Sequence, residues 1–403
     1  MSARNRQESL YLPDPEIEVN SLDGIITIAS HPFAPPTSNE QLVHQAISLG
    51  LPIADAPAAQ KLIDATGFTT RYWSNSPEDE QNIPAALERT AKIGAKLLRT
   101  VMAQQGWDDL DVFVDTSAIL PTAINHMVLE AAGLNADRIS TRSLRYACAG
   151  FLSALIDLEA AKCFQKARVV IGAMEPLSLL VERSQFTSLD TIAIPAIFGD
   201  DYAFAAVDFD RFRIHHKKIR VQPDGNTIKL KTLYRPDQAA ETNSPIPDYY
   251  EFLNGGREIF TYGPNGAFVH IDDPVCGQNA SIDGPNTGLF FGDETADVGQ
   301  VLLTEMGDLN FIRNLHGYNF VRHPASKPVD QRIIKRMFLG KLLDTREPDF
   351  IMGQIKSSNS SSASIAINLQ NRIRLGLIRP QAQFFFAAPG IGSAIAVAAG
   401  EFT

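Results

Sequence analysis

One cysteine of this chain stands in a setting that suits a nucleophile. The stretch SLRYACAGFLSALIDLEAAKC, residues 143–163, runs from a strand-like segment through Cys148 into a helical pattern. The spacing predicts a sharp strand-to-helix turn at Cys148, next to unpaired N–H groups and the positive end of the helix dipole. Both favour the thiolate, which is the nucleophilic form of the side chain. A lone cysteine among apolar residues more often serves packing, so the turn alone leaves both interpretations open.

Two further polar residues follow predicted strands. His323 ends the strand-like YNFVRH (318–323), and Asn359 follows the strand-like DFIMGQIK (349–356). Loops at the carboxyl ends of parallel strands gather at one edge of a sheet, so Cys148, His323 and Asn359 could share one pocket. Each also has a structural alternative, because a single histidine is more often structural and Asn359 could cap the following helix.

The elements that must position these residues alternate between strands and helices. Strand patterns occupy 24–33, 110–117, 167–175, 381–390 and 393–402, and helix patterns occupy 85–105, 124–134, 149–163, 330–343 and 361–376. Such alternation predicts an α/β protein with a parallel sheet covered by helices on both faces. The alternation occurs twice, which predicts two related halves, 1–210 with the cysteine and 211–403 with the histidine and asparagine. Residues 222–300 are rich in Pro, Gly, Asn and Asp, which predicts a loop-rich elaboration.

The composition excludes several classes of protein. The 403 residues carry a net charge of −10, which disfavours general binding to nucleic-acid phosphates. No run reaches the roughly 18 consecutive apolar residues of a membrane span, and MSARNRQESLYLPDPE at the start lacks the apolar core of a signal peptide. Cys148, Cys163 and Cys276 have no disulfide or metal-ligand spacing. We therefore expect a cytoplasmic protein without nucleic-acid, membrane or metal partners.

Seven segments, in the same order along the chain, resemble those of β-ketoacyl-ACP synthase III enzymes of the thiolase-like superfamily. YACAGFLSAL resembles the family's active-site segment, VRHPASK its His-Gln-Ala-Asn motif, and SSNSSSAS its Gly-Asn-Thr-Ser-Ala-Ala-Ser motif. The others are DATGFTTRYW, VDTSAILPT, IFGDDYAFAAV and APGIGSA. The resemblance extends over roughly residues 24–403, interrupted by the long middle region. It implies a five-layered αβαβα fold of two similar halves and a homodimer.

The resemblance also implies a Cys-His-Asn site. Cys148 would take an acyl group from an acyl-CoA or acyl-carrier-protein thioester, and His323 and Asn359 would hold the carbonyl of a malonyl-type thioester. Two donors aimed at that oxygen stabilise the enolate left by CO2 loss, and the enolate attacks the acyl-cysteine to give a 3-ketoacyl product. The backbone N–H groups of Cys148 and Gly390 would hold the tetrahedral oxyanion. No bound cofactor is required.

Several residues depart from the family's pattern. Lys61 and Ala65 stand where the resemblance places a tryptophan and an arginine that clamp the CoA adenine, which makes a carrier-protein donor at least as suitable. Leu120 stands where the family often has a phenylalanine that crosses the dimer interface to cap the acyl pocket. A smaller side chain there would suit a longer acyl chain, or Leu120 merely fills the interface. Asp200 and Asp201 lie in a segment that is normally glycine-rich, and a buried aspartate there would need hydrogen-bond partners.

We therefore expect an acyltransferase that performs decarboxylative Claisen condensation, with secondary-metabolite or polyketide assembly as its setting. A second possibility is transfer of the acyl group from the cysteine to an alcohol, amine or thiol without carbon–carbon bond formation. Asn359 argues against it, because simple transfer leaves no enolate to stabilise. A third possibility is a catalytically silent thiolase-fold subunit, although such subunits typically lack the nucleophile that Cys148 would supply.

Overall fold

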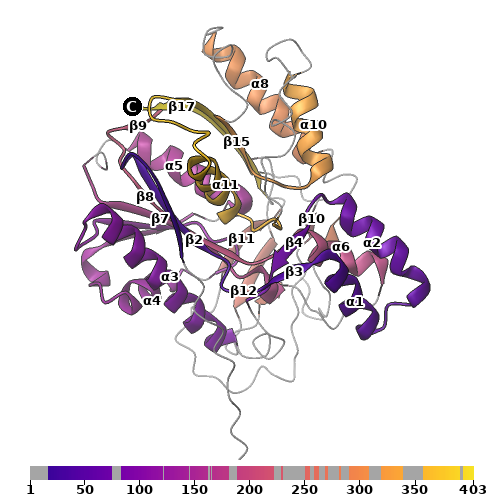
Figure 1. Ribbon diagram of the computed structural model, residues 1–403. Coiled ribbons are helices and arrows are strands. Elements are labelled where there is room, and N and C mark those ends of the chain that lie inside the picture. Colours follow the sequence, from indigo (N-terminus) through magenta and orange to yellow (C-terminus); the bar gives the residue numbers. More distant parts are fainter. Residues whose placement is uncertain are drawn as a thin grey trace, which may run out of the picture.

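The computed structural model places the chain in stacked layers of sheet and helix. It describes residues 17–74, 83–120, 122–144, 146–161, 164, 166–180, 188–221, 228–229, 250–254, 258–262, 268–270, 281–282, 290–307, 319–338, 357–390 and 394–403. Two sheets are covered on their outer faces by helices and separated by two further helices (Figure 1). The predicted five-layered αβαβα architecture is therefore confirmed. The predicted strand 349–356, Cys163 and Cys276 lie outside the described residues, as does most of 222–300.

The first sheet contains six strands in the order β1-β2-β8-β7-β5-β6. They are β1 (Glu18–Leu22), β2 (Ile26–His31), β5 (Val112–Asp115), β6 (Ser140–Ser143), β7 (Val169–Glu175) and β8 (Asp201–Val207). Strand β5 pairs in parallel with β6 and β7, whereas β8 runs antiparallel to both β7 and β2. Helices α3 (Ile83–Gln105) and α4 (Ile124–Ala131) cover the outer face of this sheet (Figure 1).

The second sheet contains four described strands in the order β15-β16-β17-β9. They are β15 (Phe320–Arg322), β16 (Gln383–Gly390), β17 (Ala394–Phe402) and β9 (Phe212–Val221). Strand β9, with the sequence FRIHHKKIRV, is rich in basic residues and lies at the edge of the described sheet. Helices α8 (Thr295–Met306) and α10 (Lys327–Phe338) cover the outer face.

Both sheets are mixed, so the prediction of a parallel sheet was wrong. The lengths of two connections explain the difference. Only three residues separate β16 from β17, far fewer than the dozen or more that a parallel crossover requires, so the two strands must be antiparallel. Strands β1 and β2 form a hairpin of the same kind.

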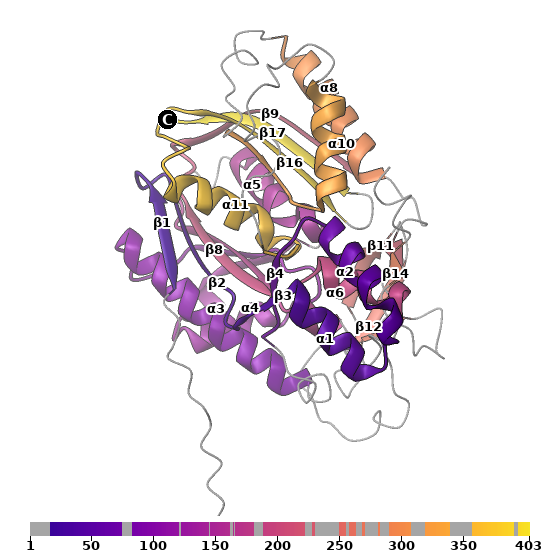
Figure 2. The same cartoon turned by 45° about the vertical axis from the view of Figure 1, so that its right-hand side comes forward.

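Two helices lie between the sheets, and each begins beside a predicted catalytic residue. Helix α5 (Gly150–Ala160) follows Cys148, and α11 (Ala363–Arg374) follows Asn359. Both helices contact strands of both sheets (Figures 1 and 2). Helix α5 is buried continuously from Gly150 to Ile156, as expected for a helix that is apolar all round and packed on two sides. Cys148 and Asn359 therefore lie in the interior of the molecule.

The core occupies both faces of each sheet. On β16, Phe384 and Phe386 pack toward the middle helices, whereas Phe385 packs toward the outer ones. On β8, Ala205 faces the middle layer and Phe204 the outer layer. Side chains of a strand alternate between faces, and a strand buried on both faces reads as a continuous apolar run. This is why FFFAAPG and DYAFAAV show no polar alternation in the sequence.

The remaining elements lie mostly at one end of the first sheet. Helix α1 (Asn39–Leu49) begins at a capping box formed by Ser38 and Gln41 and ends at Gly50, which has a φ of 118°. The others are α2 (Ala56–Ala65), α6 (Leu189–Ile197), the antiparallel pair β3 (Pro36–Ser38) and β4 (Thr70–Tyr72), and the short strands β10 (Ile228–Lys229), β11 (Tyr250–Asn254), β12 (Glu258–Tyr262), β13 (Phe268–His270) and β14 (Ser281–Ile282).

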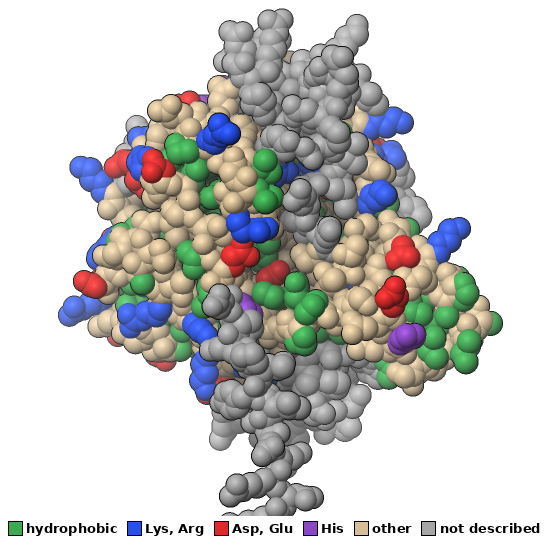
Figure 3. Space-filling model, viewed as in Figure 1, with side chains coloured by type: hydrophobic (Ala, Val, Ile, Leu, Met, Phe, Trp, Pro, Cys, Tyr) green, Lys and Arg blue, Asp and Glu red, His purple; other side chains and the backbone are tan. Residues whose placement is uncertain are grey.

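The described surface carries charges of both signs, interspersed over the face shown in Figure 3. Apolar side chains gather at the right-hand end of that view. Leu49, Ile53 and Leu62, on α1, α2 and the turn between them, are exposed apolar residues. Among the described residues, no helix has both the length and the apolar character needed to cross a membrane.

Candidate active site

Cys148 lies on a tight turn between a strand and a helix, where the sequence predicted it. The chain leaves β6 at Ser143, makes one 3-10 turn at Ala147–Ala149 and enters α5 at Gly150. Ala147 has a φ of 45°, a left-handed conformation that residues other than glycine seldom adopt, so the backbone is strained directly before Cys148. Cys148 itself is only 2% exposed. The turn is thus observed, and the chemical role of Cys148 stays a prediction.

Gly150 brings the Cys148 turn into contact with two other segments. A Cβ at position 150 would lie 2.9 Å from the backbone oxygen of Thr116 and 3.1 Å from Oγ of Ser362. The hydroxyl groups of Thr116 and Ser362 are hydrogen-bonded at 2.7 Å. Because Thr116 follows β5 and Ser362 precedes α11, the missing side chain at Gly150 allows the Cys148 turn to approach the turn that carries Asn359.

His323 directly follows β15, and its backbone N–H donates to the oxygen of Ala387 at 2.9 Å. The imidazole is 1% exposed, and burial lowers the pKa of His323 to about 3, so the ring is neutral at physiological pH. Neither ring nitrogen has a hydrogen-bond partner among the described residues. A neutral imidazole carries one N–H donor, and leaving such a group unpaired in the interior is costly. The ring is therefore suited to donate to the oxygen of a bound substrate.

Asn359 is held by its backbone and by its amide oxygen. Its N–H donates to the oxygen of Ile197 at 2.8 Å, and its own backbone oxygen accepts from the N–H of Gly199 at 3.2 Å. Oδ1 accepts from the N–H of Ser361 at 2.8 Å, so the donor end of the amide, Nδ2, points the opposite way. Asn359 does not cap α11, whose N-cap residue is Ser362. The side-chain amide of Asn359 is thus fixed in one orientation, with its NH2 group directed away from Ser361.

Gly390, the last residue of β16, lies against the turn that carries Cys148. A Cβ at position 390 would lie 2.4 Å from the backbone oxygen of Tyr146 and 3.1 Å from the backbone nitrogen of Ala149. A second oxyanion donor would have to lie this close to the Cys148 turn. Donation by the N–H of Gly390 stays a prediction.

The residues predicted to surround the substrate lie in contrasting environments. Leu120 is fully buried within its own chain, where it belongs to the hydrophobic core. Lys61 and Ala65 are exposed on α2. The roles of Leu120 at the acyl pocket or the dimer interface, and of the α2 positions in choosing the donor, stay predictions.

Asp200, which had no predicted role, joins three segments. Its carboxylate accepts four hydrogen bonds of 2.5–2.7 Å, from the N–H and hydroxyl groups of Ser74 and of Ser178. Burial raises the pKa of Asp200, and these hydrogen bonds oppose the shift. Asp200 therefore holds the segments after β4 and β7 against the start of β8, and its partners satisfy the requirement of a buried aspartate.

Replacing the neighbouring Asp201 with asparagine should remove a pH-dependent loss of stability. Burial, reinforced by the charge of Asp200, raises the pKa of Asp201 to about 8. Between pH 4 and 8 the folded protein therefore keeps a proton that the unfolded chain has released, so the free energy of unfolding falls as pH rises across this range. The loss is on the order of 5 kcal/mol at most. Asparagine keeps an oxygen for the N–H of Tyr202, which donates to Asp201 at 3.1 Å.

Urea unfolding of Asp201→Asn and wild type from pH 4 to 8.5 measures this effect. We expect the stability difference between the two proteins to be small at pH 4 and to grow in favour of the variant up to about pH 8. Taking the difference removes the contributions of buried carboxyl groups that do not interact with Asp201. The exposed Asp210→Asn is the control and should show no such trend. A difference that stays constant with pH would contradict the raised pKa of Asp201.

Glu175 was not predicted from the sequence, yet its carboxyl group joins the loop after β5 to the beginning of α11. It ends β7, is fully buried, and accepts hydrogen bonds from the N–H groups of Ala118 and Ser362. Burial, with a smaller contribution from the nearby Asp115, raises the pKa of Glu175 well above its usual value. The sequence did contain one signal, a glutamate at the end of the apolar run VVIGAME. Such a position indicates a buried carboxyl group, and carboxyl groups with strongly shifted pKa values are often found at functional sites.

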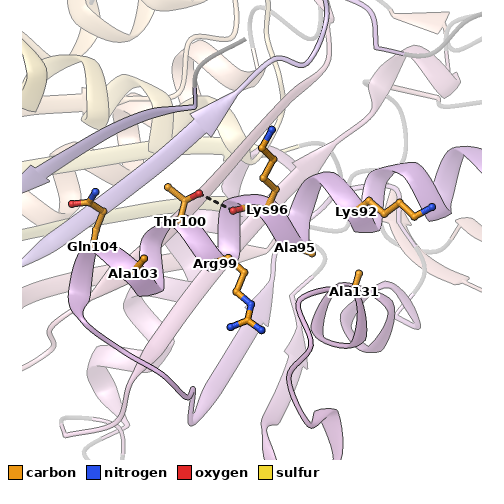
Figure 4. A pocket seen from close by; sticks show the side chains of 8 residues that line it. All are labelled: Lys92, Ala95, Lys96, Arg99, Thr100, Ala103, Gln104 and Ala131. Atoms are coloured by element: carbon orange, nitrogen blue, oxygen red, sulfur yellow. Dashed lines mark hydrogen bonds between the residues drawn. The ribbon is translucent and has the colours of Figure 1, made fainter. Parts of the chain in front are cut away.

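A surface groove of about 580 Å³ is lined by a different set of residues (Figure 4). It is lined by side chains of α3 and one of α4, namely Lys92, Ala95, Lys96, Arg99, Thr100, Ala103, Gln104 and Ala131. None of Cys148, His323 and Asn359 lines it, so the groove does not extend the site. Within the described ranges, no cluster of three or more His, Cys, Asp or Glu side chains is arranged to hold a metal ion.

Comparison with known proteins identifies the fold. No protein-family model matches the sequence, and no curated protein matches it by sequence. Among solved structures, tetrahydroxynaphthalene synthase from Streptomyces coelicolor A3(2), a bacterial type III polyketide synthase, matches with a TM-score of 0.66 and 14% identity over 93% of this chain and 98% of that one. The 3-oxoacyl-(acyl carrier protein) synthase III of Pseudomonas aeruginosa PAO1 matches with a TM-score of 0.62 and 15% identity over 93% and 96% of the two chains.

Germicidin synthase from Streptomyces coelicolor, another type III polyketide synthase, matches with a TM-score of 0.66 and 12% identity over 96% of this chain and 99% of that one. Identities this low establish the fold rather than the activity. The match extends over nearly the whole length of every chain compared, so both sheets and the helices between them are included. This chain therefore has the thiolase-like fold that 3-oxoacyl-ACP synthase III enzymes and type III polyketide synthases share.

Proposed function

We propose that this chain is an acyl-thioester condensing enzyme that forms an acyl-Cys148 intermediate and a 3-ketoacyl product. The observation that carries the proposal is the convergence of three segments. The Cys148 turn contacts the end of β16, and it also contacts the turn that carries Asn359 through Gly150. His323 follows β15, the strand paired with β16. A cysteine, a neutral histidine and an oriented asparagine amide thus reach one region of the interior.

The first half-reaction would load the cysteine. Sγ of Cys148 attacks the carbonyl carbon of an acyl thioester, the carbon–sulfur bond of the donor breaks, and the donor thiol leaves with the proton. The N-terminus of α5 favours the thiolate form of Cys148. Backbone N–H groups of Cys148 and Gly390 would stabilise the tetrahedral oxyanion.

The second half-reaction would form the carbon–carbon bond. His323 and Asn359 each donate one hydrogen bond to the carbonyl oxygen of a malonyl-type thioester. Loss of CO2 moves the electron pair of the broken carbon–carbon bond into an enolate, which attacks the acyl-Cys148 carbonyl and releases the thiolate. Because the pKa of His323 is about 3, the imidazole stabilises the enolate as a neutral donor and does not protonate it.

The acyl donor can be a thioester of either CoA or an acyl carrier protein. The proteins with the same fold include a 3-oxoacyl-(acyl carrier protein) synthase and type III polyketide synthases. We propose that this chain uses acyl-CoA or acyl-carrier-protein thioesters in fatty-acid-like or polyketide assembly. We also propose a homodimer, for which β6 offers an unpaired edge of the described first sheet.

Intact-protein mass spectrometry tests the proposed function. Wild type and Cys148→Ala are incubated with a panel of acyl-CoA and acyl-carrier-protein thioesters. We expect a mass gain equal to the acyl group on the wild type and none on the variant. Malonyl thioester should then remove the acyl mass with release of CO2. An equal mass gain on Cys148→Ala would contradict the proposal, and loss of the acyl group to an alcohol or amine without CO2 release would favour simple acyl transfer.

A further inference from the structure

We infer that Glu175 is a positioning residue that fixes the Asn359 turn against the rest of the site, an inference that rests on the proposed function. The carboxyl group of Glu175 accepts from the N–H of Ala118 at 3.1 Å to each oxygen. Its Oε1 also accepts from the N–H of Ser362 at 3.0 Å. One side chain therefore joins the end of β7 to the loop after β5 and to the beginning of α11.

The bond to Ser362 gives an acceptor to one backbone N–H at the beginning of α11. The first N–H groups of a helix, including that of the N-cap residue, have no partners within the helix. Ser362 is the N-cap residue of α11, and its side chain is hydrogen-bonded to Thr116. Because Asn359 lies only three residues before Ser362, the acceptor on Glu175 limits the movement of the whole turn.

The bond to Ala118 anchors the same carboxyl group on the opposite side. The loop after β5 is already attached to β7, since the N–H of Met174 donates to Oγ of Ser117 at 3.0 Å. The same loop contains Thr116, which contacts Gly150 beside the Cys148 turn. Glu175 therefore lies where the Cys148 turn, the loop after β5 and the Asn359 turn are held together.

The protonation of Glu175 determines which substitution should preserve this arrangement. Burial favours the neutral carboxyl group, and a neutral carboxyl group presents one carbonyl oxygen as acceptor. Glutamine has nearly the same shape and also presents one carbonyl oxygen, so Glu175→Gln should hold the turn. Alanine would remove the acceptor that the N–H groups of Ala118 and Ser362 share, and Glu175→Asp would shorten the reach of the carboxyl group by one methylene.

Comparing the rates of the two half-reactions distinguishes a positioning role of Glu175 from a general loss of structure. Loading of Cys148 does not use Asn359, whereas decarboxylation and condensation do. A displacement of about 1 Å can lower a rate on the order of 100-fold. Glu175→Ala should therefore load Cys148 within about threefold of the wild-type rate and lose condensation by on the order of 100-fold. Glu175→Asp should show the same selective loss to a smaller degree.

The experiment measures both half-reactions in single turnovers for the wild type and the three Glu175 variants. Mass spectrometry follows acylation, and labelled CO2 follows decarboxylation of the malonyl thioester. Selective loss of the second half-reaction in Glu175→Ala or Glu175→Asp, with both rates retained in Glu175→Gln, supports the inference. If Glu175→Ala fails to fold, the rates of the two half-reactions in Glu175→Asp and Glu175→Gln still test the inference.

Equal losses in both half-reactions, or a Glu175→Gln as impaired as Glu175→Asp, would overturn the positioning role. A wild type that never acquires an acyl group on Cys148 would overturn the proposed function, and the inference with it.

Discussion

Replacing Asn359 with aspartate should leave acylation of Cys148 intact and reduce condensation by about 100- to 1,000-fold. Aspartate keeps an oxygen where Oδ1 accepts from the N–H of Ser361, so the turn is preserved. It replaces Nδ2 with an oxygen that cannot donate once ionised and that repels the negative charge on the enolate. The loss corresponds to about 3–4 kcal/mol of transition-state stabilisation, the size expected for one oxyanion donor.

The same single-turnover assay checks this expectation. Acylation serves as the internal control, because it needs Cys148 but not the amide of Asn359. If Asn359→Asp slowed both half-reactions to the same extent, a collapse of the turn would explain the result better than the loss of a donor. If it condensed at the wild-type rate, Asn359 would not be the enolate-stabilising residue.

Replacing Gly390 with alanine should slow acylation of Cys148 by on the order of 100-fold and lower stability by about 1–3 kcal/mol. The added Cβ would lie 2.4 Å from the backbone oxygen of Tyr146, closer than such atoms can approach. Backbone rather than a flexible side chain must therefore move, and Tyr146 is only two residues from Cys148. The turn that aims the sulfur would be displaced.

Gly106→Ala is the matched control for that substitution. A Cβ at Gly106 would meet no atom within 4 Å, although its φ of 67° makes alanine unfavourable by about 1 kcal/mol. This variant should lose some stability and acylate normally. Measuring urea unfolding and the acylation rate for both variants separates the two effects. Wild-type acylation by Gly390→Ala would show that this contact does not set the geometry of the turn.

The Cys148 turn could be predicted because its signals are local. A strand-like segment, small residues at Ala149 and Gly150, and a helical repeat all lie within about 20 residues. The five-layered fold followed from the family resemblance rather than from periodicity. Periodicity alone predicted a parallel sheet. It indicates which residues are buried, but it does not indicate the direction in which neighbouring strands run. The antiparallel placement of β8 between β7 and β2 depends on packing between distant segments.

The supporting carboxyl groups could not be predicted for a related reason. Ser74 lies 126 positions before Asp200, and Ser362 lies 187 positions after Glu175. A carboxylate at the end of an apolar run indicates burial, but its partners become known only once the segments are packed. The sequence therefore indicated candidates for the reacting residues and omitted the carboxyl groups that join the segments around them.

The strained backbone conformation of Ala147 determines when the Cys148 turn can form during synthesis of the chain. Ala147 at a φ of 45° and Ser361 at a φ of 46° are held in left-handed conformations, which persist only where surrounding structure enforces them. Ser362 and Gly390 pack against the Cys148 turn, and both are synthesised more than 200 residues after Cys148. A nascent chain should therefore lack the Cys148 turn. Its thiol would gain the predicted activating setting only when the last strands are in place, so acylation of Cys148 should await complete folding.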